Sequence, residues 1–226
     1  MTQACETQLI RLMQLSSSAL PVGGFTYSQG LEWAVECGWV STEDSLRAWL
    51  ADLIETNLQY LEIPILVRML KACADKDELA LSRWIDILLA HRETSELRLE
   101  ETNRGRAMVR LLEELEIDFA QQWKRVLAKS QTAGFALAMA HWQIDKNMGA
   151  QGFAWAWLEN VVISGVKIIP LGQVAGQRIL RDLAQPLAAA VDKGLVVSNE
   201  AIGSSSPALA YASARHETQY TRLFRS

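Results

Sequence analysis

Lys167 is the side chain that a reactive site could use most directly. It lies in the apolar stretch VVISGVKIIPLGQ, where removal from water would favour the neutral amine, a nucleophile that attacks carbonyl substrates. The same lysine could instead extend its charged end to solvent or pair with a carboxylate. No acid, base or phosphate-binding motif accompanies it. A small helical enzyme that uses Lys167 as an amine nucleophile is therefore an alternative hypothesis.

The histidines and serines of the chain do not have the spacing of metal-binding or catalytic motifs. Metal-binding histidines on a helix stand three or four residues apart, whereas His91, His141 and His216 are isolated in the sequence. We expect each to be a satisfied surface or core histidine. Ser16–Ser18 precede a proline and not a GxSxG elbow, and no GxxxxGK[ST] phosphate loop occurs. The sequence thus predicts no catalytic residue, no metal ligand and no cofactor.

The C-terminal tail has the composition of an interface. Aromatic and apolar side chains near arginines are typical of protein contacts, and this much apolar content at a chain end predicts docking, either onto the chain's own body or onto a partner. Both possibilities remain open. We expect these residues to lie mostly on one helical face: Tyr211, His216, Tyr220, Leu223 and Phe224, beside Arg215, Arg222 and Arg225.

The stretch SSSALPVGGFTYSQGLE, residues 16–32, interrupts a helical pattern. The proline ends the preceding helix, and Gly23 and Gly24 permit a turn with positive φ. Phe25 and Tyr27 then stand on a defined turn ahead of Glu32. Such a loop suits presentation of side chains to another protein.

The elements that position these residues are helices throughout. Apolar residues recur at helical spacing in about ten segments, and no stretch alternates with the period of a strand. We expect an all-α, single-domain bundle, with an all-α body over 1–203 and a partner-docking tail over 204–226 that belongs to the same domain. Ser41 and Asp77 are expected helix caps. We also expect helices over 119–129, 171–183 and 186–191, with Pro64 either kinking or restarting a helical run that continues to Ala74.

Composition narrows the class further. The chain has 226 residues and a formal net charge of −4, so no basic field predicts a nucleic-acid or membrane partner. Cys5, Cys37 and Cys73 are interpreted as free thiols of a reducing compartment. The start of the chain lacks a secretory signal, and no apolar run reaches membrane-spanning length. A cytoplasmic protein is expected.

Three stretches together resemble the urease accessory protein UreF family: LMQLSSSALPVGGFTYSQGLE (12–32), VKIIPLGQVAGQ (166–177) and the final HETQYTRLFRS. The resemblance implies a helical homodimer without enzymatic activity that takes part in nickel insertion into apo-urease. It implies partnership with the accessory protein UreD or UreH and recruitment of the GTPase UreG. Direct nickel binding by the isolated chain is a third reading.

The resemblance also assigns residues. Lys167 and Gln173 match the family's K-x-x-P-L-G-Q segment, linked to GTPase recruitment, and Arg222 matches the terminal R-L-F, expected to become ordered when the complex forms. The family often has tyrosine at Phe25 and serine at Thr221, so a hydroxyl contact is missing at Phe25. A helix-terminus contact or a dimer salt bridge is the alternative for the charged residues. The candidate partner-binding residues are Phe25, Tyr27, Glu32, Lys167, Gln173, Tyr220, Arg222, Leu223 and Phe224.

Overall fold

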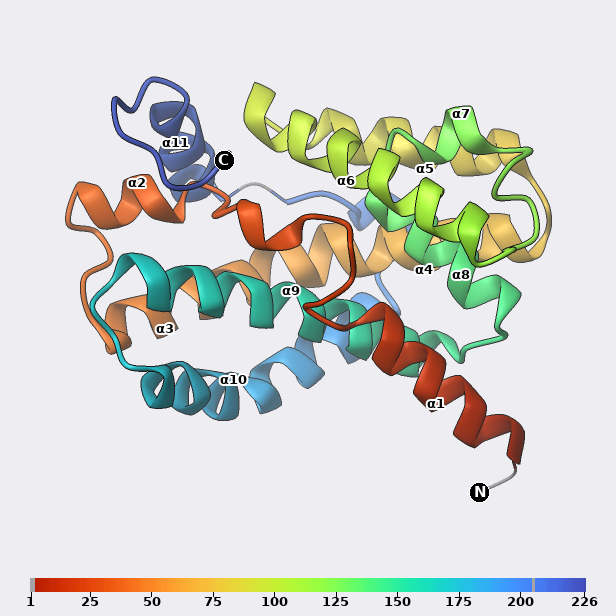
Figure 1. Cartoon of the computed structure of the whole chain (residues 1–226), viewed down its shortest axis with the longest axis horizontal. Helices are drawn as coiled ribbons and strands as arrows, with labels where there is room; N and C mark the ends of the chain where they lie inside the picture. The colour runs from red at the N-terminus through yellow and green to blue at the C-terminus, as the bar shows by residue number, and fades with distance from the viewer. Residues whose placement is uncertain (1–2, 205) are drawn as a thin grey trace.

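The computed structural model describes residues 3–204 and 206–226, and within them every regular element is a helix (Figure 1). The first half contains α1 (Gln3–Leu15), α2 (Leu31–Glu36), α3 (Glu43–Leu53), a π-helical segment η2 (Ile54–Glu62), α4 (Ile63–Ala74) and α5 (Glu78–Ala90). The second half contains α6 (Ser95–Glu114), α7 (Lys124–Leu127), α8 (Gln131–His141), α9 (Lys146–Ile168), α10 (Gln173–Gly194) and α11 (Pro207–His216). Short 3₁₀ turns η1 (Gly24–Thr26) and η3 (Asn199–Ala201) complete the set. The predicted all-α class is confirmed.

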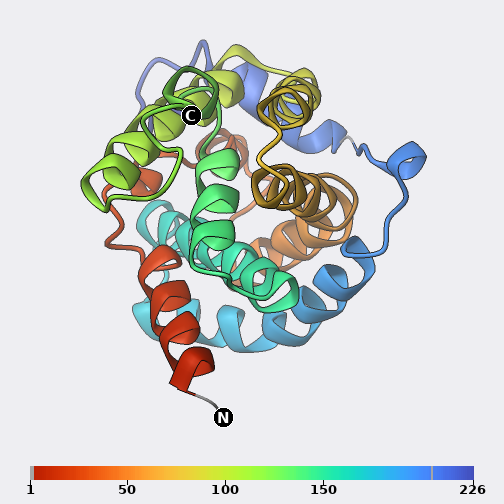
Figure 2. The same ribbon diagram turned by 90° about the vertical axis from the view of Figure 1, so that its right-hand side faces the viewer.

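The centre of the bundle is α8, with α4, α6 and the other long helices arranged around it (Figure 2). Residues 131–139 of α8 are all buried, which is the expected fate of a helix that is apolar on all sides. Small residues let the neighbours approach closely: a Cβ placed on Gly134 would meet the Met108 side chain of α6 at 2.5 Å. The core is therefore built around one short helix that is rich in small side chains.

Several predicted boundaries need correction. Asp77 caps α5 as expected, but Thr42 caps α3 in place of Ser41, through a reciprocal pair of bonds with Ser45. α4 begins at Ile63 with Pro64 in its first turn, and the chain reaches it through η2 without a break. The stretch 119–129 is mostly turns, and only Lys124–Leu127 is helical.

The prediction of two helices on either side of Pro186 was wrong, because α10 runs through it. A proline inside a helix costs about 3 kcal/mol through a lost hydrogen bond and a steric clash. The apolar stripe before the proline, with Ile179 and Leu183, continues after it in Leu187 and Val191, and all four residues are buried. Burial of that continuous stripe against η2 and α9 outweighs the cost.

The cysteines whose side chains are described carry free thiols, exposed at Cys37 and buried at Cys73. Burial raises the pKa of the Cys73 thiol to about 12, which fits an inert core residue. The Cys5 side chain lies outside what the structure describes. No helix in the described ranges is both long and apolar enough to cross a bilayer.

Candidate functional site

The 16–30 loop between α1 and α2 is shaped by glycine. Gly23 has φ of 72° and Gly30 has φ of 78°, conformations that glycine adopts without steric cost. A Cβ on Gly30 would lie 2.7 Å from the backbone nitrogen of Ser213, so this glycine also lets α11 press against the start of α2. Gly24, expected to share the turn, does not have positive φ.

The loop presents one aromatic side chain and buries the other. Phe25 is 55% exposed, whereas Tyr27 is only 6% exposed and its carbonyl accepts a hydrogen bond from the Ser164 hydroxyl of α9 at 3.4 Å. Tyr27 therefore anchors the loop to the bundle. Of the two predicted contact residues, Phe25 is the one available to another molecule.

Residues 217–226, called here the terminal segment, return to this loop after α11. The Arg225 amide donates to the Thr26 carbonyl at 2.8 Å. The main-chain oxygen of Ser226 accepts from the Ser28 hydroxyl at 2.7 Å and from the Gln29 amide at 3.0 Å. The structure thus places the tail on the chain's own body, one of the two arrangements that the sequence left open. The single helical face expected for the tail is wrong, because α11 ends at His216.

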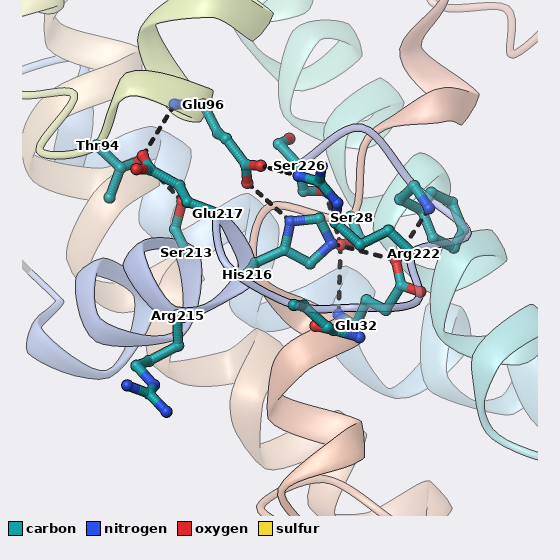
Figure 3. A network of polar contacts seen from close by, with 12 residues as sticks. Ser28, Glu32, Thr94, Glu96, Ser213, Arg215, His216, Glu217, Arg222 and Ser226 are labelled. Atoms are coloured by element: carbon teal, nitrogen blue, oxygen red, sulfur yellow. Dashed lines mark hydrogen bonds and ion pairs between the residues drawn. The ribbon is translucent and has the colours of Figure 1, made fainter.

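A polar cluster fixes the terminal segment, and we call it the His216 junction: the buried Glu32, Glu96 and His216 with the exposed Arg222 (Figure 3). His216 has no exposed surface. Its Nδ1 lies 2.7 Å from Glu96 Oε2 and its Nε2 lies 3.2 Å from Glu32 Oε2. Arg222 donates to Glu96 Oε1 at 2.8 Å. His216 is therefore a satisfied core histidine, as expected.

Glu32 joins the junction to the backbone of the terminal segment. Its carboxylate accepts the amide of Leu223 at 2.6 Å and that of Phe224 at 2.9 Å. These bonds turn the Phe224 ring inward, where 6% of the residue is exposed, and leave Leu223 outside with 68% exposed. Tyr220 is fully exposed.

The carboxylates that organise this face come from α6, and the sequence analysis missed them. Glu96 serves the junction, and Glu100 accepts from Arg104, from Gln29 and from the Ser226 hydroxyl. Glu101 accepts from the Ser130 hydroxyl at 2.7 Å and pairs with Arg92, which also pairs with Glu62. The spacing of Glu96 and Glu100 places both on one helical face, and this is the sequence signal that could have found them.

In the buried group formed by Arg92, Glu62 and Glu101, the pKa values of Arg92 and Glu101 are shifted. Burial alone would raise the pKa of Glu101, but the Arg92 charge and the Ser130 hydroxyl outweigh it and leave that pKa lowered. Burial likewise opposes the charge on Arg92, and Glu62 and Glu101 together raise its pKa above the ordinary value. The Glu101 carboxylate and the Arg92 guanidinium are therefore ionised inside the fold.

Lys167 and Gln173 lie elsewhere, at the turn between α9 and α10. Both are exposed, and within residues 3–204 and 206–226 no hydrogen bond or ion pair joins either of them to the loop or to the terminal segment. Lys167 belongs to the last turn of α9, where a cation is favoured by the helix dipole. The burial on which an amine nucleophile would depend is absent.

Taken together, fold and site define an all-α protein whose buried charges hold chain segments together on one face. Among the described residues, no group of three or more histidine, cysteine or acidic side chains could hold a metal ion. Comparison with known proteins gives this class its family.

Residues 40–184 match the family model of UreF. The chain is 50% identical over 218 residues to a urease accessory protein UreF of Pseudomonas putida strain W619, which covers 96% of this chain and 97% of the relative. It is 50% identical over 223 residues to the UreF of Alcanivorax borkumensis and 44% identical over 219 residues to that of Enterobacter sp. strain 638, at 96% coverage of this chain or more. The chain belongs to the UreF family of urease accessory proteins.

Proposed function

We propose that this chain is a non-catalytic scaffold in urease maturation, which joins UreD or UreH and recruits the GTPase UreG to deliver nickel into apo-urease. Nickel is cargo in this proposal, carried by the partners. Family membership supports the maturation role, and the individual partners follow from the motif resemblance of the loop, the 166–177 stretch and the chain end. We propose further that the chain acts in the cytoplasm as a homodimer.

The observation that carries the proposal is the display of apolar side chains by two adjacent stretches of chain. Phe25 belongs to the loop, and Tyr220 and Leu223 belong to the terminal segment that is hydrogen-bonded along it. Exposed apolar groups on an ordered backbone are characteristic of protein contact sites. We assign the terminal segment on this surface to the accessory protein UreD or UreH, and the loop that carries Phe25 to the region that meets the GTPase, as the resemblance implies.

We assign the exposed turn between α9 and α10 to the GTPase. The Lys167 and Gln173 side chains are both exposed there, and within residues 3–204 and 206–226 neither makes a side-chain hydrogen bond or ion pair, so a partner could use them without breaking the fold. Substitution of both by alanine is expected to reduce co-purification of UreG and to leave co-purification of UreD or UreH unchanged. Equal loss of both proteins, or of neither, would contradict this division of surfaces.

The test of the main proposal is co-purification from cells that express the urease genes, combined with urease activity at limiting nickel. The variant pair is Leu223→Ser and Leu79→Ser, because Leu79 on α5 is similarly exposed, at 73%, but remote in sequence from both stretches. We expect Leu223→Ser to lower both UreD or UreH capture and urease activation, and Leu79→Ser to lower neither. Full activation in cells lacking the chain would overturn the proposal.

A further inference from the structure

Pro186 divides α10 into two parts. A proline has no amide hydrogen, so the Asp182 carbonyl lacks the helical donor that another residue at position 186 would supply. α10 follows a curved path around the bundle (Figure 2), and prolines are a common cause of bends in helices. Residues 173–185, called here the α10 arm, can therefore be positioned separately from the rest of the helix.

The α10 arm carries one side of the turn that we assign to the GTPase. Gln173 is its first residue, and Val174 follows with 70% of its surface exposed. Lys167, on the other side of the turn, belongs to α9. A partner that contacts both sides needs them at one relative position. That position depends on how the arm lies against the bundle.

Apolar contacts attach the arm to the bundle. Ile179, Leu180 and Leu183 are buried, and Gly176 permits a close approach to α9, because a Cβ there would lie 3.0 Å from the Val166 side chain. Burial of apolar surface has no preferred direction, whereas the hydrogen bonds of an ion pair do. Charged contacts from the arm to another helix are therefore suited to define its orientation.

Ion pairs of this kind connect the arm with α3. Arg178 donates from Nε to Glu43 Oε1 at 3.0 Å and from Nη2 to Glu43 Oε2 at 2.6 Å. Arg47 Nε lies 3.2 Å from Asp182 Oδ2, and Arg47 Nη2 donates to Glu43 Oε1 at 3.0 Å. We call these four residues the α3–α10 clamp.

The geometry of the clamp distinguishes it from an ordinary surface ion pair. Single exposed pairs contribute little, but bidentate pairs and networks contribute more. Arg178 meets Glu43 through two bonds, and the Glu43 side chain is only 22% exposed. The hydrogen bond from Arg178 lowers the pKa of Glu43, and Glu43 in turn raises the pKa of Arg178. Each partner thus favours the charged form of the other.

We propose that Glu43 and Arg178 are positioning residues for the GTPase: the α3–α10 clamp holds the α10 arm so that Gln173 and Val174 lie at a fixed place beside Lys167. The inference rests on the proposed function in taking the turn between α9 and α10 as the contact site of UreG. An arm that is held before contact loses less conformational entropy when the complex forms. The clamp residues act through the arm and need no contact with UreG.

The experiment compares two matched pairs of full-length variants with the wild-type chain. Glu43→Gln breaks the clamp from α3, and Asp44→Asn makes the same change at a neighbour whose ion pair with Arg47 stays within α3. Arg178→Met breaks the clamp from the arm. Arg181→Met is its control, because the ion pair of Arg181 is with Asp182 of the same helix.

Amide hydrogen exchange of the free chain tests whether the clamp holds the arm. We expect Glu43→Gln and Arg178→Met each to lower the protection of Ile179 and Leu180 by about fivefold. Protection at Leu187, beyond the proline, and in α8 should stay as in the wild type, which also verifies that the variants fold. Unchanged protection of the arm in both clamp variants, or an equal loss in the two controls, would overturn the proposal.

The dissociation constant of purified UreG, measured with the complex of each variant and UreD or UreH, tests what the clamp is for. We expect each clamp variant to weaken UreG binding by about fivefold and the controls to bind as the wild type does. The double variant Glu43→Gln with Arg178→Met should bind no more weakly than the weaker single variant, because both changes remove one contact.

Additive losses in the double variant would mean that one of the two side chains meets UreG itself, and would overturn the positioning role. Lost protection of the arm with unchanged UreG binding would overturn it as well. Failure of every form to bind UreG, the wild type included, would instead overturn the proposed function of the turn. The exchange data would then still decide whether the clamp holds the arm.

Discussion

The contact between α4 and α8 and the polar face of α6 hold the molecule together in different ways. Between α4 and α8, side chains such as Leu66, Met69 and Leu137 are buried without polar groups to satisfy. On the polar face of α6, by contrast, each buried carboxylate has named donors from other segments. Apolar burial spreads its free energy over many atoms, whereas removal of one donor leaves a buried charge unpaired. The first region defines the fold, and the second defines where loop and terminal segment attach.

The largest effect on stability is expected at Arg92, because its removal leaves two buried carboxylates without their cation. Arg92→Met should lower the free energy of unfolding by about 3–5 kcal/mol, since Glu62 and Glu101 then lack their cation. Urea denaturation followed by circular dichroism measures this change. Arg110→Met, at an exposed position of the neighbouring α6, is the control and should change stability little. A loss below ~1 kcal/mol for Arg92→Met would mean that the polar face carries no greater penalty than an ordinary surface.

A truncation in the apolar region should come next. Leu66→Ala is expected to cost about 2–5 kcal/mol, because Leu66 is fully buried and the closely packed helices cannot collapse into the space. Unlike Arg92→Met, it should make no change in the pH dependence of stability. Denaturation at two pH values distinguishes the two variants. If the stability lost in Leu66→Ala depended on pH, the proposed difference between the apolar region and the polar face would be wrong.

Gly105 tests the place where the two regions meet. A Cβ there would lie 2.7 Å from the Ser130 nitrogen and 2.9 Å from the Ala128 carbonyl oxygen, so Gly105→Ala must push α6 away from the start of α8. We expect a loss of about 1–3 kcal/mol in thermal or urea unfolding. Gly172→Ala is the matched control, because no atom lies within 4 Å of its Cβ and its φ is −72°. Equal stability of the two variants would contradict the close packing described.

The smallest effect is expected from acid at Glu217. Hydrogen bonds from Ser95, followed by backbone amides of α6, outweigh desolvation and hold the pKa of Glu217 below its ordinary value of 4.5. Its contribution to stability is therefore complete above that value and is lost as the pH falls through the lowered pKa. The amide resonances of Ser95 and Glu96 should shift over that interval. Glu217→Gln should abolish this titration, and persistence of the shift in the variant would assign it to another group.

Helical periodicity was enough to predict the class, the 16–30 loop and caps such as Asp77, because these depend on local residue types. Continuation of α10 through Pro186 was not predictable locally, since it depends on the burial of Leu187 and Val191 against distant helices. The role of the α6 glutamates was equally hidden. Their donors come from residues such as Ser130, His216 and Ser226, which only the folded chain brings together. The pattern showed a charged helix face but not that the face is buried.

The candidate partner-binding residues also fall into two groups, one exposed and one buried within the fold. Glu32 was selected for its place after the loop, and the structure gives it a structural task, as acceptor for the segment that carries Leu223 and Phe224. Phe25, Tyr220 and Leu223 are exposed, whereas Tyr27 and Phe224 are anchors. Their partner contacts stay predictions. Sequence motifs selected these residues, while burial separates the side chains that could meet a partner from those that hold the surface in shape.

The central claim is that the terminal segment is docked on the body through the polar face, independently of the apolar core. Native-state hydrogen exchange of the free wild-type chain, at low urea concentrations, tests it most directly. The amides of Leu223 and Phe224 should be protected and should open with a smaller free energy and a weaker urea dependence than the amides of α8. Unprotected amides at these residues, or opening only together with α8 in global unfolding, would contradict the claim.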